Sequence, residues 1–149
     1  LQAAGFRLVV VTNQPGIGMG YFPKEAFFSV NRAMYLALRP AQVGIDRIYF
    51  CPHTYADKCE CRKPGTALFK RAIQELNIDV EHSYMVGDMT SDIQAGRSIG
   101  CKTILLQSGQ GGKDGLFEVK PDHVARDLVE AAELVTDPHT GSRNVTKAN

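Results

Sequence analysis

The sequence predicts an α/β fold built on a mostly parallel, doubly wound sheet of the Rossmann-like type. Short runs of apolar, β-branched or aromatic residues alternate with stretches of helical periodicity, and Gly or polar residues bound each run. Strands that alternate with helices form βαβ units with right-handed crossovers and with helices on both faces of the sheet. The predicted strands cover residues 7–11, 47–50, 84–86 and 103–106.

Four helices are predicted between and after these strands. Pro23 stands at the first turn of a helix over residues 24–39, and residues 66–77 carry one apolar stripe at helical spacing. Ser91 can cap a short third helix that ends before Gly100. A last helix is expected over residues 127–135.

Length and composition place the chain among globular proteins. Its 149 residues, 44% of them hydrophobic and 22% charged, suit one domain, which we assign to residues 1–136; the polar, turn-rich residues 137–149 are expected to be a disordered tail. The net charge of +1 does not indicate the basic surface that a nucleic-acid or membrane partner would require. The sequence shows no long apolar run and no leader pattern, and its clustered cysteines suit a reducing compartment, so a cytoplasmic location is expected.

One polar loop holds four residues with metal-binding side chains. Cys51, His53, Cys59 and Cys61 fall within eleven residues, and thiolates with one imidazole form the ligand set of a closed tetrahedral zinc site. The alternatives are unrelated core cysteines or disulfides, which the close spacing and the polar, Pro-marked surroundings disfavour. Cys101 stands apart, before an apolar run, and is interpreted as a buried thiol.

Polar clusters follow three of the predicted strands. Ligands of parallel α/β sheets bind beyond the carboxyl ends of the strands, so these clusters are the candidate site. The residues are Thr12, Asn13 and Gln14 after the first strand, Arg62 and Lys63 at the end of the cysteine loop, and Asp88 with Asp92 after the third strand.

Each cluster also has a purely structural interpretation. The stretch after Asn13 could be an ordinary glycine-rich turn, and Lys63 a solvated surface lysine. Asp88 could ligate Mg²⁺ or cap a helix, and Asp92 could anchor Lys63 or interact with a helix dipole. Taken singly, the clusters do not decide between these readings.

Taken together, the three clusters resemble the motifs of the haloacid dehalogenase superfamily of phosphohydrolases. Thr12-Asn13-Gln14 is similar to the second family motif, Lys63 to the third and Gly87-Asp88-x-x-x-Asp92 to the fourth, a resemblance that covers residues 1–135. The pattern C-x-H…C-x-C-R-K-P resembles the zinc-loop subclass that contains heptose bisphosphate and histidinol-phosphate phosphatases. The stretch from Thr12 to Phe22, with Gly20, resembles the heptose type more closely.

The resemblance implies a Mg²⁺-dependent hydrolysis through an aspartyl-phosphate, with structural Zn²⁺ and no large cap domain. Thr12, Asn13 and Gln14 would bind the phosphoryl group, Lys63 would offset its charge, and Asp88 would ligate Mg²⁺. Asp92 would support Lys63, and Arg62 would clamp a remote phosphate or the sugar. The implied substrate is a small phosphorylated metabolite, a sugar bisphosphate such as D-glycero-D-manno-heptose 1,7-bisphosphate or alternatively histidinol phosphate, and the implied state is a monomer.

Two departures from the family pattern stand out. Met89 follows Asp88 where the heptose type commonly has lysine, and no D-x-D occurs, although that motif carries the family's nucleophile and its acid/base group. We therefore expect the nucleophile and the central strand upstream of Leu1. The alternative is a non-catalytic, zinc-stapled module that binds phosphorylated ligands or a partner chain. A nucleic-acid-binding zinc module is disfavoured by the neutral net charge.

Overall fold

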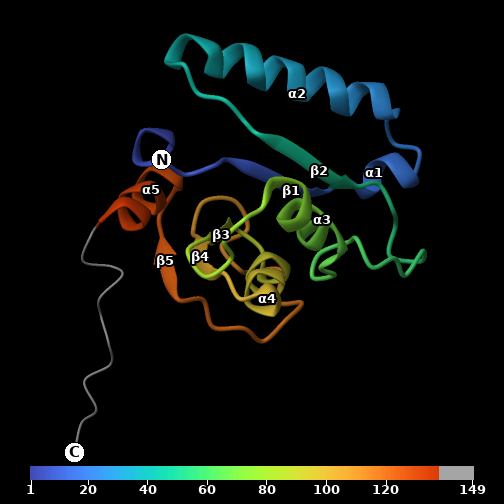
Figure 1. Ribbon diagram of the computed structural model, residues 1–149. Helices are drawn as coiled ribbons and strands as arrows, with labels where there is room; N and C mark the ends of the chain where they lie inside the picture. Colours follow the sequence, from blue (N-terminus) through green and yellow to red (C-terminus); the bar gives the residue numbers. More distant parts are fainter. Residues whose placement is uncertain (138–149) are drawn as a thin grey trace, which may run out of the picture.

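The computed structural model describes residues 1–137 and confirms the α/β class (Figure 1). Most of the predicted disordered tail lies outside the described residues. The strands are β1 (Val9–Asn13), β2 (Arg47–Cys51), β3 (Tyr84–Gly87), β4 (Lys102–Leu106) and β5 (His123–Ala125). The helices are α1 (Pro15–Gly18), α2 (Lys24–Leu38), α3 (Ala67–Leu76), α4 (Thr90–Ile99) and α5 (Leu128–Thr136), with 3₁₀ turns at Gln2–Ala4 and Arg39–Ala41. None of these helices is long and apolar enough to cross a bilayer.

The strands form two parallel sheets. β1 pairs with β2 in a register that sets Asn13 opposite Cys51, and β4 lies between β3 and β5. β1 and β3 belong to different sheets. Every described strand pair is parallel, as predicted.

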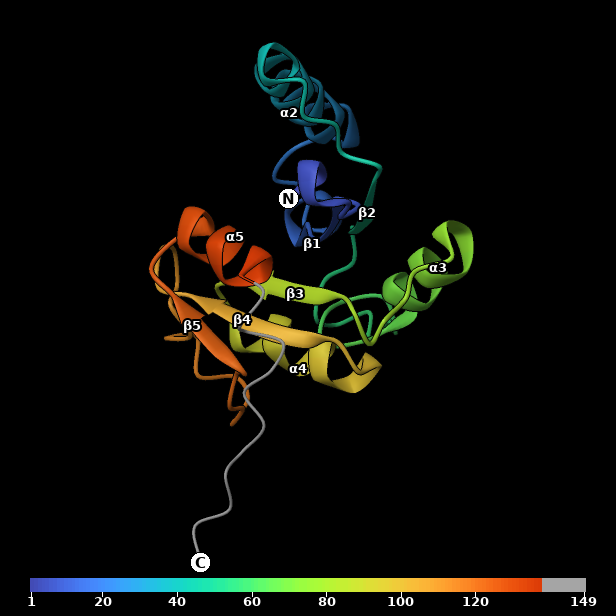
Figure 2. The same ribbon diagram turned by 60° about the vertical axis from the view of Figure 1, so that its left-hand side comes forward.

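Helices cover both faces of the β3-β4-β5 sheet, with α4 on one face and α5 on the other (Figure 2). The core between these layers is small and closely packed, with Ile93, Ile104 and Ala125 almost fully buried. Gly96 lets α4 approach the sheet, because a Cβ at this position would lie only 2.6 Å from Cβ of Met85. This packing fixes the start of α4, from which the site takes Asp92.

The predicted third helix, with Ser91 as its cap, needs a correction at its first turn. The helix begins at Thr90, with Met89 as N-cap, and Ser91 is a buried residue inside it. Asp92, in the first turn of the helix, supplies a capping hydrogen bond by reaching back toward the N-terminus. Its Oδ2 accepts from the N–H of the N-cap residue Met89 at 3.1 Å. Gly100 ends the helix in the left-handed conformation, as predicted.

The other elements lie within two residues of their predicted bounds. Pro23 is the N-cap of α2 rather than its first helical residue, and Asp127 caps α5 by accepting from the N–H groups of Val129 and Glu130. The sequence pattern did not predict β5, which is three residues long, or the single turn α1. Both are too short to show a hydrophobic period.

Candidate active site and metal centre

The carboxyl ends of β1 and β2 bring the first cluster beside the cysteine loop. Asn13 is the last residue of β1 and Cys51 the last of β2, and the Gln14 N–H donates to the Cys51 carbonyl at 2.8 Å. The Gly18 N–H donates to the Pro52 carbonyl at 2.9 Å, so α1 is tied to the start of the loop as well. The candidate phosphate-binding residues and the metal loop therefore form one continuous structure.

Asn13 connects the two segments more tightly through its side chain. Its Nδ2 donates to the Lys63 carbonyl at 3.3 Å, and its Oδ1 accepts from the Lys63 N–H at 2.9 Å. This pair of hydrogen bonds satisfies the amide of Asn13 inside the protein. The side chain of Asn13 thus fixes the end of the cysteine loop at Lys63, and its backbone N–H is the candidate donor to a ligand.

Lys63 is held on two sides and is nearly buried. Its ammonium donates to the Val11 carbonyl at 2.6 Å and lies 2.7 Å from Oδ1 of Asp92, with side-chain exposures of 11% for Lys63 and 6% for Asp92. Val11 belongs to β1 and Asp92 to α4, so this one ammonium links β1 to the helix that packs on the other sheet. A lysine in this setting is not the solvated surface residue that the alternative interpretation required.

Asp88 follows β3 and is held by a loop from a later part of the chain. Its Oδ2 accepts from the Gln110 N–H at 2.7 Å, and its carbonyl accepts from the Gly112 N–H at 2.8 Å. Asp88 makes no described cap of α4, whose first turn is closed by Asp92. The segment 107–117, here called the glycine loop, therefore positions this carboxylate.

The glycine loop is fixed to α4 by Asp114, a residue that sequence reasoning missed. Asp114 accepts from the Thr90 N–H at 2.8 Å and from the Thr90 hydroxyl at 2.6 Å, and that hydroxyl accepts from the Phe117 N–H. Burial opposes ionisation of Asp114, but the hydrogen bonds from Thr90 outweigh it and lower the pKa of the carboxyl. A signal was present, because the loop follows the fourth predicted strand at the same edge of the sheet.

Replacing Gly109 with alanine is expected to displace Asp88. A Cβ at Gly109 would lie 2.2 Å from Oδ2 of Asp88, and the residue has φ +77°, which side chains rarely adopt. With Asp88 as the Mg²⁺ ligand that the family resemblance implies, phosphate release by the complete protein should fall at least about tenfold, because catalysis is sensitive to displacements of about 1 Å. Gly115→Ala is the matched control, with φ +57° but no close neighbour for its Cβ. Equal losses in both variants, measured at matched folded fraction, would contradict the role of Asp88.

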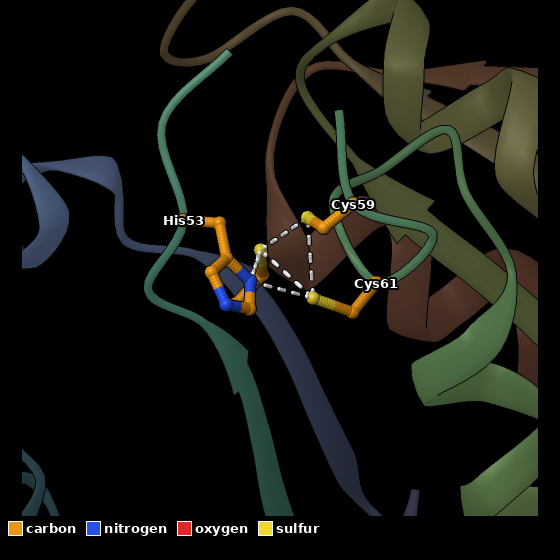
Figure 3. Close-up of side chains that lie close together, drawn as sticks. His53, Cys59 and Cys61 are labelled. Atoms are coloured by element: carbon orange, nitrogen blue, oxygen red, sulfur yellow. Dashed lines mark hydrogen bonds between the residues drawn. The ribbon is translucent and has the colours of Figure 1, made fainter. Parts of the chain in front are cut away.

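The four candidate metal ligands meet in one cluster (Figure 3). Nδ1 of His53 and the three sulfurs all lie within 4.8 Å of one another, with separations that include 3.1 Å for Cys51–Cys61, 3.5 Å for Cys51–Cys59 and 3.2 Å for His53–Cys61. A tetrahedral zinc with Zn–S bonds of about 2.3 Å sets its sulfurs about 3.8 Å apart. The cluster therefore has close to the size and the donor set that a zinc ion requires.

The structure corrects one argument about this loop. The surroundings of the cysteines appeared too polar for a buried strand, yet Cys51 ends β2 and is fully buried. Cys101 is half-buried and lies outside the cluster, and burial raises its pKa to about 11. All four cysteines are free thiols, so the disulfide alternative is not realised.

The three thiols of the cluster differ in their pKa values. Burial and its neighbours Cys51 and Cys59 raise the pKa of Cys61 to about 12, and burial raises that of Cys51. Burial also opposes ionisation of Cys59, but hydrogen bonds from Cys61 and Cys51 outweigh it and lower its pKa to about 7. Cys59 is therefore the first thiolate, and a metal that binds all three sulfurs must release the protons of the other two.

Arg62 lies directly between the cluster and Lys63 in sequence. Its Nη1 donates to the His53 carbonyl at 3.3 Å, and its guanidinium stacks on the ring of Tyr55 with Cζ 3.7 Å from the ring centre. The adjacent residues Arg62 and Lys63 bring two cations to the site. A nearly buried lysine, a strand-end carboxylate, a threonine hydroxyl and a candidate metal loop are the groups that the resemblance to the phosphohydrolases predicts, so the site fits a phosphate-processing hydrolase.

The comparisons with known proteins agree with this class. A family model described as HAD-hydrolase-like matches residues 60–131. A D-glycero-β-D-manno-heptose-1,7-bisphosphate 7-phosphatase of Haemophilus ducreyi is 41% identical over 144 residues, which are 91% of this chain and 78% of that protein. The phosphatase of the same name from Yersinia pestis is 44% identical over 119 residues, 74% of this chain and 63% of that protein.

A solved structure supports the same family assignment by superposition. The D,D-heptose 1,7-bisphosphate phosphatase of B. bronchiseptica, complexed with magnesium and phosphate, superposes with a TM-score of 0.84 at 30% identity, over 91% of this chain and 76% of that one. The chain spans between 60% and 78% of the length of the seven bacterial relatives compared. The chain belongs to the HAD-like hydrolases, in the family of the D-glycero-β-D-manno-heptose-1,7-bisphosphate 7-phosphatases.

Proposed function

We propose that the complete protein is a Mg²⁺-dependent phosphomonoester hydrolase whose substrate is a sugar bisphosphate such as D-glycero-D-manno-heptose 1,7-bisphosphate. The observation that carries this proposal is the buried ion pair between Lys63 and Asp92, located beside Asn13 at the carboxyl ends of the strands. A buried ammonium that has one carboxylate partner keeps capacity for a further anion. The names of the relatives support the sugar bisphosphate over histidinol phosphate.

The residues after β1 would bind the phosphoryl group that is transferred. Nε2 of Gln14 donates to Oγ1 of Thr12 at 3.0 Å, so the Thr12 hydroxyl proton is free to point toward a phosphoryl oxygen. The backbone of Asn13 would add a donor. Lys63, which directs its ammonium to Val11 and Asp92, would give its third N–H to the same phosphoryl group.

Asp88 would supply a carboxylate oxygen to Mg²⁺. Carboxylate oxygen is the ligand that Mg²⁺ prefers, and the glycine loop holds this carboxylate at the end of β3. Bound Mg²⁺ would offset phosphate charge and orient the phosphoryl group for in-line attack. The chain has no D-x-D, so we propose that the aspartate nucleophile and the acid/base group come from outside residues 1–149.

The cysteine cluster would hold Zn²⁺ as a structural ion. Four protein ligands leave no position for substrate, so the ion would act by fixing the loop that ends in Arg62 and Lys63. Arg62 would bind the second phosphate of the substrate, because a guanidinium forms two parallel hydrogen bonds with an anion. The cytoplasmic location and the monomeric state stay predictions.

A substrate panel tests this proposal. The complete protein should release phosphate from the heptose bisphosphate with a kcat/KM at least about tenfold above that for histidinol phosphate or p-nitrophenyl phosphate, because only the bisphosphate engages Arg62. Release should stop after dialysis into Mg²⁺-free buffer and return when Mg²⁺ is added, with the zinc content unchanged. A protein that contains the nucleophile, binds phosphorylated ligands and still releases no phosphate would support the non-catalytic binding module.

A further inference from the structure

Tyr55 stands in the metal loop, between the second and third candidate ligands, and the residue is 62% exposed. A short turn fixes its position, because the N–H and the hydroxyl of Thr54 both donate to Oδ2 of Asp57, at 2.7 and 2.8 Å. The Lys58 N–H closes the turn on the Tyr55 carbonyl at 3.3 Å. A large aromatic side chain is therefore held at the surface of the site with little burial to explain it.

The contact that the ring does make is with Arg62. Cζ of the guanidinium lies 3.7 Å from the ring centre, whereas the other cations over rings in residues 1–137 lie 5.4 to 5.7 Å away. This distance places the guanidinium in van der Waals contact with the ring face. The hydrogen bond to the His53 carbonyl fixes the edge of the same group. Arg62 is thus held on a face and on an edge by residues of the metal loop.

One N–H donor of the Arg62 guanidinium is buried and makes no hydrogen bond in this arrangement. This donor is Nε, which has no hydrogen-bond partner among the described residues. A buried, unpaired N–H of a cation is unfavourable unless a ligand supplies the acceptor. A small shift of the side chain would let an anionic oxygen bound to the guanidinium supply that acceptor, and the ordered guanidinium would lose little rotamer freedom on binding.

We infer that Tyr55 is a positioning residue, which presents Arg62 to the second anionic group of a sugar bisphosphate. This inference rests on the proposed function for the identity of the ligand. Tyr55 acts through Arg62 and does not itself touch the reacting atoms. Its effect should therefore appear with ligands that carry two phosphates and not with ligands that carry one.

The test measures Tyr55→Leu, Tyr55→Phe, Arg62→Ala and the double variant Tyr55→Leu/Arg62→Ala in the complete protein. Calorimetry in Mg²⁺-free buffer gives the Kd of the heptose bisphosphate and of inorganic phosphate, and steady-state assays with Mg²⁺ give KM and kcat. Tyr35→Leu, on α2, is the matched control for loss of a tyrosine ring. Zinc content is measured in every variant.

Tyr55→Leu should raise Kd and KM for the bisphosphate about threefold to tenfold, with kcat and the Kd of inorganic phosphate unchanged. Tyr55→Phe, which keeps the ring face, should restore the wild-type values. In the Arg62→Ala background the loss of the ring should have no further effect, because the two side chains act as one unit. Tyr35→Leu should leave all values unchanged.

Three results would overturn the inference: an unchanged Kd in Tyr55→Leu, an equal further loss in the Arg62→Ala background, or a zinc loss that accounts for the effect. Absence of bisphosphate binding by the wild type would overturn it as well. Failure of the proposed function looks different. In that case the bisphosphate binds with the Tyr55–Arg62 coupling intact, but no phosphate is released after Mg²⁺ is added.

Discussion

Replacing Lys63 with alanine is expected to lower kcat at least about a hundredfold while the protein keeps its zinc. The ammonium is the buried cation that faces the proposed phosphoryl site, and loss of one such charge-stabilising donor typically costs a factor of 10² to 10³. Lys63 is not among the four metal ligands, so the zinc content should not change. Single-turnover phosphate release and metal analysis of the same preparation measure both effects.

Stability must be separated from catalysis in this experiment. Removing Lys63 leaves Asp92 buried without its cation, which should lower the free energy of unfolding by about 3 kcal/mol. The variant Lys63→Met/Asp92→Asn removes both charges and should recover much of this stability without recovering activity. Lys70→Ala, an exposed lysine on α3, is the control for loss of a positive charge. Activity in Lys63→Ala close to that of the wild type would exclude the proposed mechanism.

Replacing Cys59 with serine is expected to remove the zinc and to destabilise the loop first. Cys59 is the most acidic thiol of the cluster, with a pKa of about 7, so its substitution removes the ligand that ionises most readily. Loss of a direct ligand should weaken zinc binding by more than about a hundredfold, the upper end of what outer-shell changes cause. Metal content after dialysis against a weak chelator, followed by thermal unfolding, measures the effect.

Cys101→Ser is the matched control for this substitution, because the Cys101 thiol lies outside the cluster. It should keep one zinc per chain. Activity should fall in Cys59→Ser together with the zinc, because the loop carries Arg62 and Lys63 at its end. A Cys59→Ser variant that keeps stoichiometric zinc and native stability would mean that the four side chains are not one metal centre.

The sequence was sufficient to place the candidate site at the strand ends because the rule for parallel strands is geometric. Once β1 and β3 were recognised from their apolar runs, Thr12 and Asp88 had to lie at carboxyl ends of strands, where ligands bind. The spacing from Cys51 to Cys61 likewise predicted one metal cluster, since the side chains share a single loop. These predictions depended on patterns within short stretches of sequence, and such stretches keep their local structure in the fold.

The features that sequence reasoning missed depend on contacts between distant segments. Ser91 was the better cap by local preference, but Asp92 reaches back to Met89 and starts the helix earlier. The hydrogen bond from the glycine loop to Asp88 joins residues 22 positions apart. The hydrogen bond between Asn13 and Lys63 joins residues 50 positions apart. No local pattern encodes such pairs. The stacking of Arg62 on Tyr55 depends in the same way on how the metal loop folds.

The arrangement of the metal loop also bears on how substrate preference can change in evolution. His53 and Cys59 anchor the two ends of the segment that carries Tyr55, and Asn13 anchors the far end of the loop at Lys63. Surface segments between fixed points tolerate insertions and deletions better than the elements that they connect. The segment that carries Tyr55 can therefore diversify in length and sequence, while the proposed phosphate-binding residues keep their positions.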